Sequence, residues 1–333
     1  MQRLLGIALA VMMLLSLAAC KEEKQDQTES VETAAISESA AKTDAPTDEQ
    51  TKGNHEVISL NFINTFDRNP SIEEQTVYEK DGLTITAKSL KYDTVHGPQI
   101  MLAAKNDSEN ELRIQNAYTT VNGFMMKPEL DIKAPARKKV ESPMSLPYLN
   151  LAMADIHSLY DVTFSLRILD SKTFSVIDTT DTVSLRLQNT AAEHPAFSTK
   201  GQTAFDSKGV KVILQGIKQD TLFESRYVLM VYIENNTKQT VCVKNDSLSV
   251  NGYDITVSMN TVVLPGVKAV DKIEIFDQDL EEYGITTIDA VNVSFEVYDY
   301  EEWKSIAKSD VIPVEVPTEL LTEATETQST ENG

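Results

Sequence analysis

The chain has 333 residues, with 51 acidic and 30 basic side chains, two cysteines and one tryptophan. Its length suggests about two domains at roughly 150 residues each, and its apolar content of 41% is enough to bury cores. The formal charge of −21 excludes binding to a phosphate backbone, because such binding needs an excess of Lys and Arg. Two cysteines exclude a disulfide framework and a Cys-rich zinc site. We therefore expect no nucleic-acid partner and no cofactor.

The N-terminus has the pattern of a bacterial lipoprotein signal. Arg3 supplies a positive charge, and residues 4–19 form an apolar run that is shorter than the ~20 residues a membrane-spanning helix needs. The run ends in Leu-Ala-Ala before Cys20, which matches the sequence that lipoproteins present for acylation. The alternative is an ordinary secretory signal with a chance cysteine. We predict a signal peptide over 1–19 and lipidation at Cys20, with the mature protein on the outer face of the cell membrane.

Two acidic segments flank the middle of the chain. Residues 20–53 hold 9 acidic and 4 basic side chains and no aromatic residue, and residues 317–333 hold 4 Glu and no basic residue. Such compositions bury too little apolar surface to offset the entropy of ordering. They predict a disordered tether and a disordered tail, with a lead-in segment over 54–76.

The middle of the chain contains an internal duplication. Asp81-Gly82 aligns with Lys208-Gly209 at an offset of 127, and Val121-Asn122-Gly123 aligns with Val250-Asn251-Gly252 at an offset of 129. The second offset continues through Phe174, which falls on Trp303. A register held over about 90 residues indicates two copies of one unit, predicted over 77–187 and 204–316 with a linker over 188–203.

Each copy has the pattern of an antiparallel β-sandwich. Residues 291–298 alternate apolar and polar side chains, as a half-buried strand does, and residues 227–233 are apolar on both faces. The expected strands of copy one are 83–90, 99–105, 112–121, 124–132, 136–146, 156–169 and 174–187. Those of copy two are 210–217, 227–233, 240–250, 253–259, 267–276, 291–297 and 303–316. About seven short strands per copy predict an all-β fold of two tandem immunoglobulin-like sandwiches.

Several short motifs predict turns. Asn251-Gly252, like its counterpart in copy one, suits a two-residue hairpin that needs positive φ at both positions. Asp279 is expected to cap a helical turn that Gly284 closes, with Asp155 in the place of Gly284 in copy one. Copy one also has Ala136 where copy two has the Gly of Pro-Gly.

Three groups of residues have side chains that can bind a metal ion or act in catalysis. Asp277, Asp279 and Glu281 are candidate Ca²⁺ ligands, since oxygen-rich groups hold this ion, but they lack the pattern of a known calcium loop and are equally explained as solvated acids. The free Cys242 lies in an alternating segment without a nearby His and is interpreted as a buried strand thiol. His157 has no Ser-containing elbow near it and is interpreted as a surface strand residue.

Phe174 and Trp303 are candidate binding residues, because they occupy the same position in the two copies. One interpretation is a core plug that closes the end of each sandwich. The other is an exposed aromatic side chain that recognises a glycan or a peptide.

The sequence resembles uncharacterised repeat-bearing lipoproteins of clostridia and related Firmicutes, and secreted immunoglobulin-like domains of unknown function. The resemblance covers about 240 residues and rests on the acylation signal, the acidic tether and motifs of the second copy, namely Gly209, Asn235-Asn236-Thr237, Val250-Asn251-Gly252, Pro265-Gly266, Asp279-Leu280-Glu281, Gly284-Ile285 and Phe295. It implies a Gram-positive cell surface and no particular activity.

The expected function is a non-enzymatic binding or envelope-organising module, held to the membrane by its lipid anchor, with an envelope protein or glycan as partner. The alternative is capture of a small molecule or of a ligand through Ca²⁺. A surface hydrolase is the third alternative, since paired carboxylates can be distant in sequence.

Overall fold

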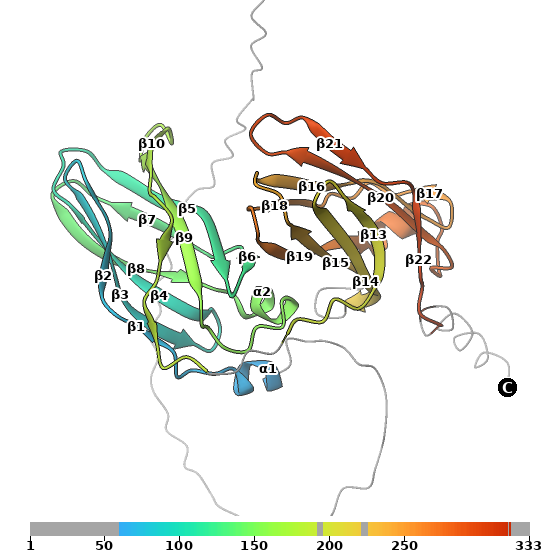
Figure 1. Cartoon of the computed structure of the whole chain (residues 1–333), viewed down its shortest axis with the longest axis horizontal. Helices are drawn as coiled ribbons and strands as arrows, with labels where there is room; N and C mark the ends of the chain where they lie inside the picture. Colours follow the sequence, from blue (N-terminus) through green and yellow to red (C-terminus); the bar gives the residue numbers. More distant parts are fainter. Residues whose placement is uncertain (1–59, 192–195, 221–225, 319, 321–333) are drawn as a thin grey trace, which may run out of the picture. The chain divides into compact units, whose positions relative to one another are not determined.

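A computed structural model describes residues 60–191, 196–220, 226–318 and 320. Its helices are α1 (Leu60–Thr65), α2 (Tyr148–Met153) and α3 (Asp277–Glu282). The strands are β1 (Ser71–Ile72), β2 (Gln75–Lys80), β3 (Leu83–Asp93), β4 (Gly97–Asn106), β5 (Leu112–Val121), β6 (Phe124–Met126), β7 (Asp131–Ala134), β8 (Lys138–Ser145), β9 (Val162–Asp170), β10 (Val176–Thr179), β11 (Val183–Ser184), β12 (Leu187–Gln188), β13 (Gln202–Ser207), β14 (Val210–Asp220), β15 (Arg226–Asn235), β16 (Val241–Val250), β17 (Tyr253–Asp254), β18 (Asn260–Val263), β19 (Lys268–Phe276), β20 (Val291–Asp299), β21 (Ser305–Lys308) and β22 (Ile312–Val314). The described chain is all-β, which confirms the predicted fold class (Figure 1).

The strands from β2 to β11, called repeat 1, form an antiparallel sandwich. One sheet has the order β2-β3-β4-β8, and the facing strands have the order β10-β9-β5-β6, with β7 paired to β5 and β11 to β9. The consecutive strands β4 and β5 lie in different sheets, while β4 pairs with β8 and β5 pairs with β9. These crossed connections are those of an immunoglobulin-like sandwich.

The strands from β13 to β22, called repeat 2, have the same order. The sheet β13-β14-β15-β19 faces β17-β16-β20-β21, with β18 paired to β16 and β22 to β20. Each strand from β2 to β11 thus has a counterpart from β13 to β22. The first strands, β2 and β13, were absent from the sequence prediction, because their polar residues alternate only weakly with apolar ones.

The alternating patterns explain the strands. Val291, Val293, Phe295 and Val297 of β20 are all buried in one cluster, as period two requires. Strand β15 is covered on both faces, which fits its apolar residues on both. Val231 and Ile233 pack in the core of repeat 2, and Tyr232, on the opposite face, packs with Phe197 and the core of repeat 1.

The apolar residues gather in two clusters. The first cluster belongs mainly to repeat 1 and also contains Phe62 and Phe66 from the predicted lead-in segment. The second belongs to repeat 2 and contains Leu320, which is 8% exposed although it falls in the predicted tail. The lead-in and the first residues of the tail therefore contribute to the cores.

A single point of pairing joins the two repeats into one sheet. Strand β6 of repeat 1 forms a parallel bridge with β19 of repeat 2 between Phe124 and Lys268. The backbone N–H of Lys268 donates to the carbonyl of Gly123 at 3.0 Å. As a result one ten-stranded sheet contains strands of both repeats.

Side chains reinforce this junction. The ring of Phe197, from the segment between the repeats, stacks on Tyr232 with centroids 5.1 Å apart. The buried Asp271 accepts hydrogen bonds from Lys127 of repeat 1 at 3.0 Å and from Thr261 at 2.7 Å. Apolar stacking and a charged hydrogen bond therefore both connect the repeats.

The turns mostly follow the sequence prediction. Asn122 and Asn251 have φ of 52° and 50°, each followed by a glycine at positive φ, as a type I′ hairpin requires. Two details are wrong. Arg137, not Ala136, has the positive φ that matches Gly266. Helix α3 begins at Asp277 with Phe276 at its N-cap, so Asp279 lies inside the helix and does not cap it.

The predicted signal peptide, Cys20 and most of the tether and tail lie outside the described residues. Within the described ranges, no helix is long and apolar enough to span a membrane.

Candidate binding surface

An aromatic side chain stands at the same turn of each repeat. In repeat 1 the carboxylate of Asp170 accepts the backbone N–H groups of Lys172 and Thr173 at 2.9 and 2.8 Å, and Phe174 N–H donates to the carbonyl of Asp170. The two backbone bonds to the carboxylate hold the pKa of Asp170 below its ordinary value. These bonds fix the turn, and the turn fixes the position of the ring.

The turn of repeat 2 is built in the same way. The carboxylate of Asp299 accepts the N–H groups of Glu301 and Glu302 at 2.9 and 2.8 Å. Trp303 N–H then donates to the carbonyl of Asp299 at 3.0 Å. We call these two segments, 170–175 and 299–304, the aromatic turns.

Both rings point into solvent from a strained backbone. Phe174 and Trp303 are each 53% exposed. The interpretation as core plugs is therefore wrong, and both residues are exposed aromatic side chains. Their φ angles are 59° and 53°, a region that glycine enters freely and bulky residues avoid. Such strain amounts to about 1–3 kcal/mol. Two repeats of different sequence both keep a large exposed ring there, which is a reason to ask what the ring contacts.

A cationic side chain lies over each ring. The guanidinium carbon of Arg113 is 4.8 Å from the centroid of Phe174, and the Lys244 ammonium is 4.9 Å from that of Trp303. Arg113 also pairs with Asp131, and that hydrogen bond lowers the pKa of Asp131. A cation within about 6 Å of a ring is attracted to its face, so each ring is held in a defined position.

The outer side of repeat 2 continues from Trp303 as a polar surface. We define the Trp303 face as the side of β16 and β20 that points away from the second core, with Trp303 at one end. Tyr298 lies next to Trp303, with the Lys244 ammonium 5.2 Å from its ring, and its hydroxyl donates to Glu296 at 2.5 Å. Further along, Asn292 donates to Ser249 at 3.4 Å.

Charges on the Trp303 face are paired. Lys308 and Asp246 form an ion pair at 2.7 Å, and the Lys308 side chain lowers the pKa of Asp246. Hydrogen bonds from Ser305 and Tyr298 lower the pKa of Glu296. At neutral pH two carboxylates therefore accompany the two lysines, Lys244 and Lys308.

The corresponding side of repeat 1 is less polar near its ring. Val176 and Ile177, which follow Phe174, are 55% and 56% exposed. Further along this side, the hydroxyls of Thr120 and Thr163 form a hydrogen bond at 2.6 Å. Both repeats thus combine a ring, a cation and a hydroxyl-bearing strand pair.

The acidic residues proposed as calcium ligands lie on α3. Asp277 and Asp279 are two positions apart, and side chains at this spacing on a helix do not face one another. In the parts of the chain that the structure covers, no group of three or more His, Cys, Asp or Glu side chains is placed to hold a metal ion.

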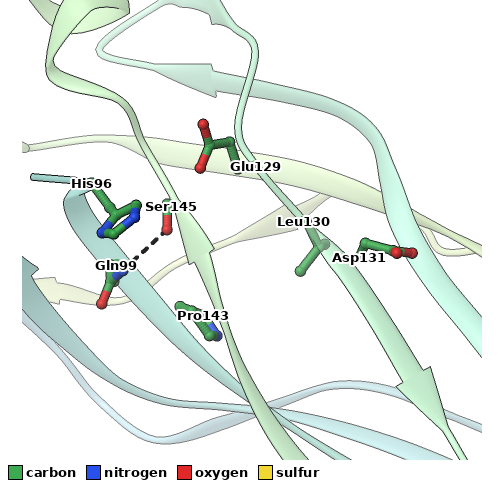
Figure 2. Close-up of a pocket in the computed structure, with 7 residues that line it drawn as sticks. All are labelled: His96, Gln99, Glu129, Leu130, Asp131, Pro143 and Ser145. Carbon is green, nitrogen blue, oxygen red and sulfur yellow. Dashed lines mark hydrogen bonds between the residues drawn. The ribbon is translucent and has the colours of Figure 1, made fainter. Parts of the chain in front are cut away.

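A pocket of about 380 Å³ lies in repeat 1 (Figure 2). It is lined by His96, Gln99, Glu129, Leu130, Asp131, Pro143 and Ser145. Gln99 donates to the Ser145 hydroxyl at 3.2 Å. The carboxylates of Glu129 and Asp131 point in different directions (Figure 2), and Asp131 is paired with Arg113. This pocket does not bring together two carboxylates as a glycosidase needs.

The contacts of the two remaining candidates, Cys242 and His157, are those of structural residues. The buried Cys242 thiol donates to Asn260 at 2.6 Å, and burial raises the pKa of this thiol, which disfavours the reactive thiolate. The exposed His157 ring contacts the Asp155 carboxylate at 2.9 Å and lies 4.7 Å from Phe62. Cys242 is the strand thiol that the sequence predicts.

Comparisons with known proteins identify no family for this chain. No protein-family model and no curated protein matches the chain. Among solved structures, a red sea bream transglutaminase is similar at 13% identity over 72% of this chain and 32% of its own, with a TM-score of 0.20. The YadV chaperone is similar at 12% identity over 65% of this chain and 92% of its own, with a TM-score of 0.22. A protein of unknown function from Porphyromonas gingivalis W83 is similar at 12% identity over 71% and 98%, with a TM-score of 0.18.

The chain spans about a third of the length of the transglutaminase. At such TM-scores and identities, the similarities carry no argument about what the chain binds or does.

Proposed function

We propose that this protein is a lipid-anchored, non-enzymatic binding module of the cell surface, whose aromatic turns contact another macromolecule of the envelope. The observation that carries the proposal is the pair of exposed rings at positive φ, one in each repeat, each with a cation over its face. Strained backbone positions concentrate at ligand contacts, and exposed aromatic residues are frequent energetic centres of interfaces.

The sequence supports the location. The acylation signal ending at Cys20 would place the chain on the outer face of the membrane, and the acidic segment over 20–53 would extend from it. Two contact points on one chain raise the effective concentration of each for a repetitive or large partner. An envelope-organising protein needs this property.

The anchor is tested by metabolic labelling with palmitate. The full chain should take up label and the Cys20→Ser variant should not. Equal labelling of both proteins would contradict lipidation at Cys20.

The binding role is tested with the mature chain, residues 20–333, carrying Cys20→Ser, so that neither the apolar signal segment nor an acyl chain causes sedimentation. The protein is mixed with washed envelope fragments and centrifuged, alone and with Phe174→Ala, Trp303→Ala or both. We expect each single variant to weaken binding and the double variant to lose at least about tenfold, as bivalent contact predicts.

The matched control is Tyr283→Ala, which removes another exposed aromatic residue of repeat 2. It should bind as the unaltered chain does. A double variant that sediments as strongly as this control would contradict the proposed function, and so would a chain that does not bind the fragments.

A further inference from the structure

The Trp303 face combines exposed rings with a strip of polar side chains on one side of β20. Trp303 and Tyr300 are 53% and 40% exposed, with ring centroids 5.9 Å apart. A flat, rigid ring offers a large apolar contact area at little cost in side-chain entropy. The apolar C–H face of a sugar ring is a matching partner for such a surface.

The strip beyond the rings offers hydrogen-bonding groups at regular spacing. Tyr298, Glu296 and Asn292 alternate with core residues along β20, so they lie on the same side. From Tyr298 to Asn292 the strand rises about 20 Å at ~3.3 Å per residue. Ser247 and Ser249 of the neighbouring β16 add hydroxyls and are half-buried. An extended chain with many hydroxyl groups would find donors and acceptors along this length.

The charge of the face argues for an uncharged occupant. Lys308 is paired with Asp246 at 2.7 Å, and Lys244 lies against the rings of Trp303 and Tyr298. With Glu296 the strands of the face carry two carboxylates and two lysines, and the turn beside the rings adds Asp299, Glu301 and Glu302 against Lys304. A polyanion would meet no positive field there and would be repelled by a chain with a net charge of −21.

From these observations we infer that the Trp303 face binds an uncharged polysaccharide, whose sugar rings stack on Trp303 and Tyr300 and whose hydroxyls bond to the polar strip toward Asn292. The inference rests on the proposed function and names the partner class for one of the two aromatic turns. Repeat 1 is a poorer site for such a ligand, because Val176 and Ile177 expose aliphatic surface beside Phe174.

The test uses chitohexaose and cellohexaose, two uncharged oligosaccharides, with the mature chain, residues 20–333, carrying Cys20→Ser. Isothermal titration should show saturable binding of at least one of them, and Trp303→Ala should weaken it at least tenfold. Asn292→Ala, at the far end of the strip, should weaken it about threefold. Trp303→Phe, which places the residue of repeat 1 in repeat 2, should retain most of the affinity.

Controls separate binding from folding. Tyr283→Ala should leave affinity unchanged, since Tyr283 stacks on Tyr253. Tyr253 pairs with the core-facing Val250, so both rings lie off the Trp303 face. Thermal melting of each variant reports whether it folds, and Trp303→Phe provides the comparison if Trp303→Ala does not.

The inference is overturned if neither oligosaccharide binds, or if binding is the same in Trp303→Ala. One outcome overturns it while the proposed function stands. If protease treatment of envelope fragments abolishes the sedimentation that depends on Phe174 and Trp303, the partner is a protein.

Discussion

Both repeats contain the Asn-Gly hairpin, but the residue after it is buried in repeat 1 and exposed in repeat 2. In both, an asparagine at positive φ donates its side-chain amide to a backbone carbonyl at 2.7 Å, from Asn122 to Ser158 and from Asn251 to Thr287. The next residue after the Asn-Gly pair differs in burial: Phe124 is 6% exposed and Tyr253 is 48% exposed. Local chemistry therefore builds the hairpin, and the neighbouring repeat decides whether its tip is a core residue or a surface residue.

The free edge of the receiving strand also differs between the repeats. Strand β19 contacts the hairpin of repeat 1 through the backbone N–H of Lys268, which donates to the carbonyl of Gly123. On the equivalent strand β8, Pro143 stands where repeat 2 has Lys272 and offers no N–H, while Ser145 already exchanges backbone bonds with Glu129 at 2.9 and 3.0 Å. Proline and local pairing are common protections of an edge strand.

A third contrast concerns the contacts of the edge strands. These are β2 and β10 in repeat 1, and β13 and β21 in repeat 2. In repeat 1 the Asp178 carboxylate accepts hydrogen bonds from Tyr78 and Lys80, both at 2.8 Å. In repeat 2 the aligned positions of Tyr78 and Asp178 are Phe205 and Ala307, both packed in the second core. At these edge strands repeat 1 thus has polar contacts, and repeat 2 has apolar packing.

The largest effect is expected from the hairpin tips. Phe124→Ala should destabilise the chain by about 3–5 kcal/mol, as removal of a buried Phe side chain does. Tyr253→Ala should cost less than about 1.5 kcal/mol, the upper range for one stacked aromatic pair. Denaturant unfolding of both full-length variants measures the difference. Equal destabilisation would show that the docked tip contributes nothing beyond the free one.

A smaller effect is expected from the acid dependence of repeat 1. Hydrogen bonds from Lys80 and Tyr78 lower the pKa of Asp178 from 3.8 to about 2. Because the folded-state pKa is the lower one, this stabilisation is present above pH 3.8 and is lost as the pH falls toward 2. Asp178→Asn should therefore lose less stability than the unaltered chain between pH 5 and pH 2.

Thermal melting across that range checks this prediction, with Glu79→Gln as a control that changes an exposed carboxylate on β2, the strand that carries Tyr78 and Lys80. Parallel pH profiles for the unaltered chain and Asp178→Asn would mean that the Asp178 contacts do not stabilise the fold.

Much of the fold could be predicted from the sequence because its signals are local. The alternation of Val291 to Val297 and the Asn-Gly pairs each specify a conformation within a few residues. The bridge between Phe124 and Lys268 could not be predicted, since it depends on two surfaces that are 144 residues apart in the chain. The alignment of Ala136 with Gly266 was wrong because it matched Pro135 with Pro265, whereas the offset of 129 that holds elsewhere places Gly266 on Arg137.

Only part of the candidate surface could be predicted from the sequence. The shared position of Phe174 and Trp303 indicated that both rings do the same thing, but whether a ring points inward depends on φ and on the strands beneath it. Their cations, Arg113 and Lys244, occupy positions that do not align between the repeats. A search for identical repeat positions therefore misses this part of the site.

The central claim is that the aromatic turns contact a partner, and Trp303 reports on it directly because it is the sole tryptophan. The measurement is its fluorescence emission in the mature chain, residues 20–333 carrying Cys20→Ser, recorded as envelope fragments are added. Burial of the half-exposed indole against a partner should shift the emission to shorter wavelength and saturate. An emission spectrum that stays unchanged while the protein sediments with the fragments would contradict the claim for repeat 2.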